Sequence, residues 1–332
     1  MLRSYGSLEI GRLVAALLVV FIHSAPLFPI SPALNQVIGH GVGRLAVPFF
    51  FIATGYFSAT ALVEDRWRWA RRIAAMYLLW TLVYAPLWLI KSPDAVTALG
   101  HIVFGFRHLW YLPALLLGGL TLSYAARLGT RRLLGLAVLV YLAGAALQYG
   151  LNARWDWVHL AAPDLAAQIP RNFLTFAFPF LTLGYVIRVQ DAAIRRVPPV
   201  WLGLAYAAAT LAFALEYALV QHFYGSNRMA DIYVVLIVLA PLIFAGLLRL
   251  PSRPIALPLG DTATSLYFNQ IYLLAIGHTV LGFGNVGMFV FAVAGGLALT
   301  PVLRWLSYFG PFLGATRKRA EPRGPALSSN LP

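Results

Sequence analysis

The sequence contains no cysteine and has few charged residues for its length. Asp, Glu, Lys and Arg make up 11% of its 332 residues, whereas soluble domains contain about a quarter. The absence of cysteine excludes a disulfide-stapled scaffold, a thiolate nucleophile and a cysteine-ligated metal site. The small polar fraction excludes an ordinary soluble domain, and the high apolar fraction excludes a disordered chain.

Hydrophobic residues are abundant and the charge is strongly basic. They make up 60% of the chain, and 25 Lys and Arg against 11 Asp and Glu give a net charge of +14. A basic nucleic-acid-binding protein fits this composition poorly, because too little polar surface remains to keep it in water, so we expect no nucleic acid partner. The composition predicts a protein that crosses the membrane several times and contacts lipid.

Apolar runs of the length needed to span a bilayer, about 20 residues, recur along the chain. They are too long for strands and lack alternation, so we predict an all-α transmembrane bundle of about ten spans. The expected spans are residues 8–28, 46–63, 72–90, 109–126, 133–151, 171–188, 199–220, 232–249, 264–282 and 286–306.

The basic residues are distributed unevenly over the segments between these spans. One set of alternate segments holds 18 of the 25 Lys and Arg residues and the other set holds six, while Arg12 lies inside the first span. Because cytoplasmic loops carry the excess of Lys and Arg, both termini are predicted to be cytoplasmic. We expect residues 1–314 to form one transmembrane domain and residues 315–332 a basic, disordered cytoplasmic tail.

The first span carries three polar groups, Glu9, Arg12 and His23. Glu9 and Arg12 lie three residues apart and can pair on one helix face. Arg12 and His23 lie within ~20° of the same face, separated by ~16.5 Å along the axis. Ionisable groups inside a span are costly and indicate a functional site. The alternative is a snorkelling arginine and a histidine satisfied by a neighbouring helix.

Five stretches in order resemble the acyltransferase type 3 family, and together they extend over nearly the whole chain. They are Glu9-x-x-Arg12-x10-His23, VPFFFIATGYF at 47–57, RWRWARRI at 66–73, HLWYLPALL at 108–116 and FPFLTLGYVI at 178–187. In the ninth span the family often has a second histidine, where this chain has Tyr272. Either that histidine is not essential, or this chain has a different acceptor or a different activity.

The resemblance implies transfer of an acyl group, commonly acetyl, from cytoplasmic acyl-CoA to a hydroxyl of a glycan or lipid-linked sugar. His23 would act as general base or as a transient acyl carrier, and the sequence leaves both open. Arg12 would guide the donor into the bundle, with Glu9 orienting it. A group of arginines would hold the CoA phosphates. The alternative is that these arginines only set the orientation of the chain in the membrane, as the positive-inside rule alone predicts. That group comprises Arg68, Arg71 and Arg72.

The acceptor would approach from the opposite side of the membrane. Trp110 and Tyr111 can stack on a sugar, and His108 can bind a hydroxyl, although an aromatic belt with an interfacial histidine is the alternative. Asn269 and Tyr272 would also lie on the acceptor side, where an ordinary interhelical hydrogen bond is the alternative for Tyr272.

No metal site and no permanently bound cofactor are expected, since no histidines or carboxylates have metal-ligand spacing. Acyl-CoA would be a co-substrate, and the oligomeric state is left open. A bacterial inner membrane is the expected location. A transporter or flippase, in which the polar groups of the first span line a substrate path, is the alternative function, and an inactive family member is a third.

Overall fold

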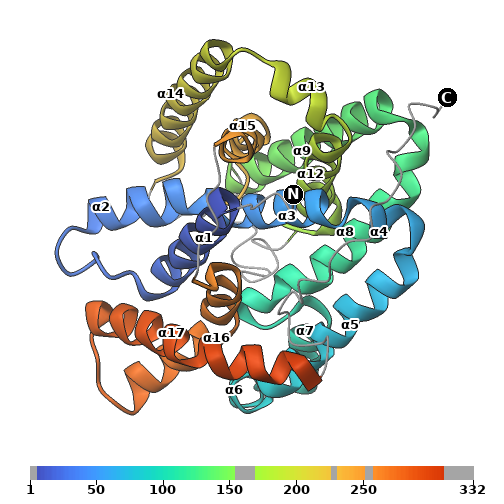
Figure 1. The fold of residues 1–332 in the computed structure, drawn as a ribbon. Helices are drawn as coiled ribbons and strands as arrows, with labels where there is room; N and C mark the ends of the chain where they lie inside the picture. Colours follow the sequence, from blue (N-terminus) through green and yellow to red (C-terminus); the bar gives the residue numbers. More distant parts are fainter. Residues whose placement is uncertain (1–5, 154–168, 226–229, 251–256, 310–332) are drawn as a thin grey trace.

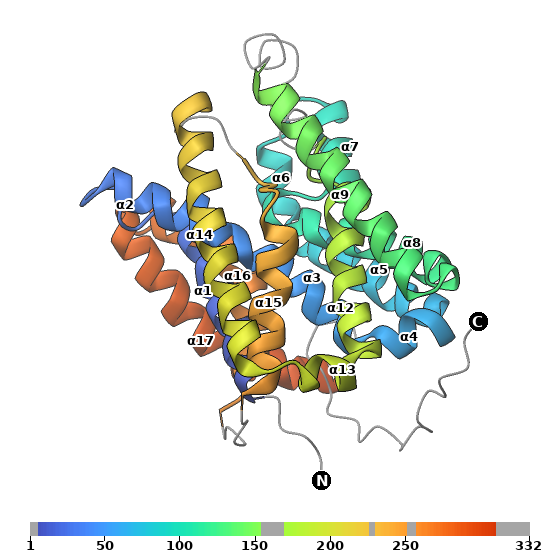
Figure 2. The same ribbon diagram turned by 90° about the horizontal axis from the view of Figure 1, so that it is seen from above.

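The computed structural model describes residues 6–153, 169–225, 230–250 and 257–309. All regular structure within these ranges is helical, as Figures 1 and 2 show. The predicted all-α class is therefore confirmed. The predicted tail at 315–332 lies outside the described residues.

The described residues form α-helices together with shorter 3₁₀- and π-helical turns. In chain order they are α1 (Gly6–Ser24), α2 (Pro32–Gln36), η1 (Val37–Gly41), η2 (Val42–Leu45), α3 (Ala46–Phe57), α4 (Ala59–Glu64), α5 (Arg66–Val83), α6 (Ala85–Ile90), α7 (Ala95–Phe104), η3 (Arg107–Trp110), α8 (Tyr111–Ala125), η4 (Ala126–Leu128), α9 (Thr130–Ala153), η5 (Phe173–Ala177), α12 (Phe178–Val189), α13 (Asp191–Arg196), α14 (Pro199–Tyr224), α15 (Leu236–Arg249), α16 (Leu259–Thr279) and α17 (Asn285–Phe309).

Six helical segments of the described residues are long and apolar enough to cross a membrane. The protein is therefore an integral membrane protein, whereas the count of ten spans and the cytoplasmic placement of the termini stay predictions. The six segments are Gly6–Ser24, Pro32–Phe57, Arg107–Leu128, Thr130–Ala153, Pro199–Tyr224 and Asn285–Leu306.

Two expected spans differ from the observed helices. The span expected at 46–63 belongs to a helical run that begins at Pro32 and passes through a π-helical turn (η1) and a 3₁₀ turn (η2) before α3. The span expected at 72–90 breaks at Tyr84, and α6 starts with Pro86 in its first turn. Proline is tolerated there because its missing N–H would have had no partner within the new helix.

Helices α3 and α12 lie against each other in the middle of the bundle, and two glycines make this contact possible. A Cβ atom on Gly55 of α3 would collide with the carbonyl oxygen of Leu181, and one on Gly184 of α12 would collide with that of Ile52. Small residues at such a crossing let two membrane helices approach backbone to backbone. This close contact fixes the positions of α3 and α12 relative to each other, and other helices pack around them.

Helix α16 packs between neighbouring helices, and its middle part faces the interior of the bundle. It packs on α1 and α17, and Ser265 donates a hydrogen bond to the Gly296 carbonyl oxygen at 2.7 Å. Trp80 stacks on Phe268 with ring centroids 4.5 Å apart, and Tyr84 donates to the Phe268 carbonyl oxygen at 2.6 Å. These contacts fix the rotation of α16 and hence the direction in which Tyr267 points.

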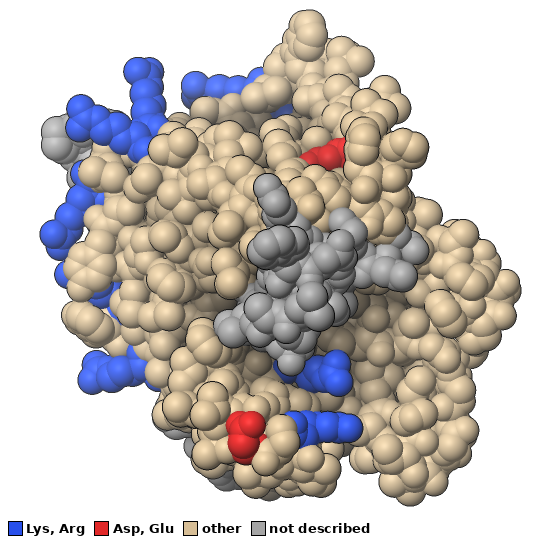
Figure 3. All heavy atoms as spheres, turned by 180° about the vertical axis from the view of Figure 1, so that it is seen from behind, with Lys and Arg blue, Asp and Glu red and all other residues tan. Residues whose placement is uncertain are grey.

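The two ends of the bundle differ. The start of α1, α4 and α13 lie at one end, and α6 and α7 lie at the other (Figure 2). Figure 3 looks onto the end with α6 and α7, where basic side chains gather along one margin and are sparse elsewhere on the face. Arg68 at the start of α5 and Arg195 on α13 belong to the α4–α13 end. Basic side chains are thus unevenly distributed over the bundle.

Candidate active site

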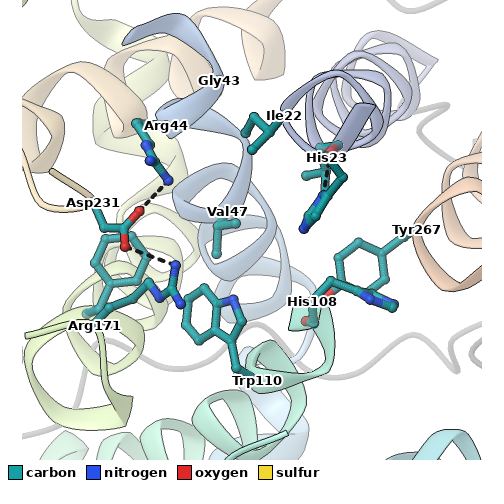
Figure 4. Close-up of a pocket in the computed structure, with 12 residues that line it drawn as sticks. Ile22, His23, Gly43, Arg44, Val47, His108, Trp110, Arg171, Asp231 and Tyr267 are labelled. Atoms are coloured by element: carbon teal, nitrogen blue, oxygen red, sulfur yellow. Dashed lines mark hydrogen bonds and ion pairs between the residues drawn. The ribbon is translucent and has the colours of Figure 1, made fainter. Parts of the chain in front are cut away.

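A cavity of about 90 Å³ lies between α1, the start of α3, η3, η5 and α16 (Figure 4). Histidine and tyrosine rings lie on one side of it, and two arginines with an aspartate lie on the other. Its lining consists of Val19, Ile22, His23, Gly43, Arg44, Val47, His108, Trp110, Arg171, Phe176, Asp231 and Tyr267.

His23 enters the cavity from the last turn of α1. Its Nδ1 lies 2.8 Å from the carbonyl oxygen of Val19 in the preceding turn. A carbonyl oxygen only accepts hydrogen bonds, so Nδ1 carries a proton and, in the neutral ring, Nε2 carries the lone pair. The side chain is exposed, although Val19 and Val20 beside it are buried, because it faces the cavity. His23 thus offers a base to the cavity.

His108 faces His23 across the cavity with ring centroids 6.5 Å apart. The residue is 3% exposed, and neither ring nitrogen has a hydrogen-bond partner among the described residues. The preceding Arg107 has φ of 53°, in the left-handed region, so the chain turns sharply just before it. Tyr267 donates to the His108 carbonyl oxygen at 2.6 Å and fixes the turn. Buried polar groups are almost always hydrogen-bonded, so His108 is available to a ligand.

A group of three charged residues, here called the arginine–aspartate cluster, forms the other side of the cavity: Arg44, Asp231 and Arg171. Asp231 is buried and accepts hydrogen bonds from Arg44 and, at 2.9 Å, from Arg171. The Arg171 guanidinium lies 4.5 Å from the centre of the Trp110 ring, a cation–π contact. Trp110 therefore links the cluster to the His108 turn.

Three segments distant in sequence bring this cluster together. Arg44 lies in η2, directly before α3. Arg171 precedes η5, whose first turn is capped by the Asn172 side chain. Asp231 is held by Gln148 of α9, whose Oε1 accepts from the backbone N–H groups of Asp231 and Ile232 at 2.8 and 2.9 Å. The Gln148 side chain thus fixes the backbone segment that carries the Asp231 carboxylate.

Glu216 of α14 lies outside the cavity and has a structural role. Its carboxylate accepts from the backbone N–H groups of Val234 and Val235 at 2.6 and 2.9 Å, at the start of α15, and from the Tyr149 hydroxyl at 2.5 Å. A carboxylate at a helix N-terminus satisfies N–H groups that have no partner within the helix. This explains an acidic residue within an apolar helix.

Arg12 lies on α1, toward the other end from His23, and is partly buried. Its Nη1 lies 3.2 Å from the position of a Cβ built on Gly260, at the N-terminus of α16. Glu9, Asp261 and Tyr111 are its electrostatic neighbours, but no acidic group lies within the 4.0 Å of an ion pair in the described chain. Glu9 and Arg12 therefore lie close without pairing directly.

The three predicted phosphate-binding arginines, Arg68, Arg71 and Arg72, are exposed near the start of α5. Helix α5 packs mainly on α8 and α4, whereas α1 packs mainly on α16 and α3. The structure thus places these arginines at the same end as the start of α1 but does not bring them to Arg12 (Figure 2).

The predicted acceptor-side residues separate into two groups. His108 and Trp110 line the cavity, whereas Tyr111, Asn269 and Tyr272 do not. The Tyr111 hydroxyl lies 3.3 Å from Thr54 Oγ1, and Asn269 donates to the Ser265 carbonyl oxygen at 3.0 Å. Tyr272 donates to the Val83 carbonyl oxygen, which is the interhelical bond that the sequence left as the alternative.

The polar side chains of the cavity that were not predicted from the sequence are Arg44, Arg171, Asp231 and Tyr267. Arg44 and Arg171 are two of the six basic residues in the less basic set of segments, and they were not singled out for any other reason. A usable signal was present, since Arg44 directly precedes an apolar run and Asp231 precedes another. Tyr267 precedes Tyr272 by five residues, and helical geometry alone does not say which of them faces the centre.

No group of three His, Cys, Asp or Glu side chains with the geometry of a metal site is found in the part of the chain that the structure describes. Tyr267 lies beside the two histidines of the cavity, and the cluster arginines lie across it (Figure 4).

The fold and the cavity define a class: an integral membrane protein with two histidines that line a cavity in a helical bundle. The family model of the type 3 acyltransferase domain matches residues 5–305, so the chain belongs to this family of membrane acyltransferases. The resemblance inferred from the five sequence stretches is confirmed.

Curated relatives match over part of their length. An amino-acid racemase of Enterococcus faecalis is 32% identical over 153 residues, which are 41% of this chain and 22% of the relative. A serine/alanine racemase of Enterococcus gallinarum is 30% identical over 200 residues, 54% of this chain and 28% of the relative. The chain therefore spans less than a third of these relatives. No solved structure matches it.

Proposed function

We propose that this protein is an O-acyltransferase that moves an acyl group, acetyl in the first instance, from cytoplasmic acyl-CoA to a hydroxyl of a glycan or lipid-linked sugar. The observation that carries the proposal is the Nε2 lone pair that His23 offers to the cavity. Acyl-CoA is a co-substrate, with no resident cofactor. The protein acts in a bacterial inner membrane.

His23 Nε2 removes the proton of the acceptor hydroxyl while its oxygen attacks the thioester carbonyl carbon. The new C–O bond forms, the C–S bond breaks, and the proton returns to the departing thiolate, which leaves as CoA–SH. The bond from Nδ1 to Val19 holds the ring in the tautomer that this step needs. In the acyl-carrier form, Nε2 attacks the carbonyl carbon first and the C–S bond breaks, which releases the CoA thiolate. The acceptor hydroxyl then attacks the acyl carbon, the C–N bond breaks, and the hydroxyl proton passes to the thiolate.

The donor enters from the end of the bundle at which α1 begins. Arg12 lies on the same helix as His23, ~16.5 Å away along the axis, and can accompany the donor toward the cavity. Its guanidinium lies beside Gly260 with no ion pair to a carboxylate in the described chain, which supports a role toward an anionic ligand. Arg68, Arg71 and Arg72 lie exposed at that end, where they can attract the CoA phosphates.

Replacing Arg12 by Ala should weaken acetyl-CoA binding about 10- to 100-fold, because a charge-assisted contact to the donor is lost. Equilibrium binding to the purified full chain in neutral detergent, together with the rate of thioester hydrolysis, measures this. The exposed Arg132, at the start of α9, provides the matched control as Arg132→Ala. Unchanged affinity in Arg12→Ala would remove Arg12 from the donor site. No binding of any acyl-CoA to the unaltered protein would overturn the proposed function itself.

A further inference from the structure

The arginine–aspartate cluster contains one positive charge that no carboxylate of the cluster balances. Arg44 Nη2 lies 2.9 Å from Nδ1 of His40. A guanidinium only donates, so this histidine nitrogen accepts and the His40 ring is neutral. Two guanidinium groups then face the single carboxylate of Asp231. The cluster therefore has a net charge of +1.

This net charge lies in a largely buried part of the protein, where an unbalanced charge is energetically unfavourable. The Arg44 and Asp231 side chains are 10% and 6% exposed, and that of Arg171 is 22% exposed. The Nε atoms of Arg44 and Arg171 are buried without a hydrogen-bond partner among the described residues. An uncompensated charge and unused donors inside a membrane protein are strongly unfavourable unless a ligand completes them.

The unused donors border the same cavity as His23. Arg44, Asp231 and Arg171 lie on one side and His23 and His108 on the other, with Val47 between them (Figure 4). Trp110 lies under the Arg171 guanidinium and offers an apolar face at the point where the two sides meet. A ligand in this cavity therefore meets a cation at one end and a base at the other.

We propose that the arginine–aspartate cluster is the recognition site for a singly charged oxyanion on the acceptor, a carboxylate or a phosphodiester. The acceptor is thus an acidic molecule, held by its anionic group at Arg171 and Arg44 while a hydroxyl reaches His23. Arginine forks suit planar or tetrahedral oxyanions, and one negative charge balances the cluster. The binding of an anion is inferred from the cavity alone. The identification of the bound molecule as the acceptor rests on the proposed function.

The test is binding of small probes to the full chain in neutral detergent at low salt. Glucuronate represents a glycan carboxylate, dihexanoyl phosphatidylglycerol a lipid phosphodiester, and glucose the neutral comparison. We expect one of the two anions to bind at least about tenfold more tightly than glucose, with affinity falling as salt rises. The better anion identifies the source of the charge. Equal binding of all three probes to the unaltered protein would overturn the proposal without any variant.

Arg171→Gln should weaken binding of the better anion about 10- to 100-fold, because it removes the net charge and the donor fork. Lys91→Gln is the control. Lys91 is exposed at the end of α6, and its replacement by Gln removes the same charge from the molecule as Arg171→Gln does. An equal loss in both variants would assign the effect to the overall field instead. Arg171→Lys keeps the charge and should retain part of the affinity. This result would show that the loss in Arg171→Gln is not caused by a folding defect.

Three further outcomes separate this site from the proposed transferase. Excess CoA should leave the bound anion in place, and its displacement would assign the cluster to the donor. Anion binding that is lost in Arg171→Gln while the unaltered protein binds no acyl-CoA would keep the site and reject the transferase. Acyl-CoA turnover combined with probe binding that is the same in Arg171→Gln and in the unaltered protein would reject the site and keep the transferase.

Discussion

His23→Ala should lower the rate of acyl transfer about 10²- to 10⁴-fold, the usual range for a positioned general base. The loss should be confined to turnover, because His23 contributes one hydrogen bond within its own helix, to Val19, and faces a cavity rather than a packed core. Acetyl-CoA affinity should therefore change little. Single-turnover transfer, measured beside equilibrium donor binding, distinguishes the two effects.

His222→Ala is the control for this variant, because His222 lies exposed near the end of α14, outside the cavity lining. Full activity of His23→Ala would remove His23 from the mechanism. Incubation of the unaltered protein with labelled acetyl-CoA and no acceptor separates the two roles of His23. Label retained on the protein after rapid denaturation, and absent in His23→Ala, indicates an acyl carrier, whereas its absence from both favours a general base.

Gly184→Ala should destabilise the fold strongly although it adds a single methyl group. The new Cβ would collide with the carbonyl oxygen of Ile52 and approach the backbone nitrogen of Tyr56 to 2.8 Å. Overpacking typically costs about 1–3 kcal/mol, and a collision with backbone belongs at the upper end, because no rotamer change relieves it. We expect a clear fall in the thermal unfolding midpoint in detergent, with Gly55→Ala behaving alike.

Gly135→Ala on α9 and Gly203→Ala on α14 test whether this result depends on position. A Cβ at either site meets nothing within 4 Å, so alanine should be neutral or should stabilise its helix by up to about 1 kcal/mol. If Gly184→Ala unfolds at the same temperature as these two variants, the close approach of α3 and α12 is not needed for stability.

The sequence predicted what depends on composition and helical periodicity. The all-helical class follows from long apolar runs, and each expected span coincides with helical residues. The positions of Arg12 and His23 on one helix follow from helix geometry, which needs no tertiary information. The family resemblance rested on ordered motifs and was equally independent of packing.

That the three residues of the arginine–aspartate cluster meet could not be predicted from the sequence, for a physical reason. Arg44, Arg171 and Asp231 come from three separate segments, and their contact depends on how those segments pack. A count of basic residues per loop treats Arg44 and Arg171 as orientation signals and discards their position. Likewise the choice between Tyr267 and Tyr272 depends on the rotation of α16, which is set by Trp80, Tyr84 and α17.

The π-helical turns η1 and η5 have a consequence for how this site varies among related chains. A π-turn contains one residue more than the α-turn it replaces, which makes it equivalent to a one-residue insertion. Losing that residue within Val37–Gly41 would rotate the preceding helix by about 100° relative to α3 and carry its side chains to another face. The same holds for Phe173–Ala177, which separates Arg171 from α12. A chain that lacks one residue within Phe173–Ala177 can keep every helix and lose the Arg171 contacts of the cluster, whereas a loss within Val37–Gly41 leaves Arg44 in place, because η2 follows that turn. Chain length in η5 therefore matters for the cluster as much as residue identity.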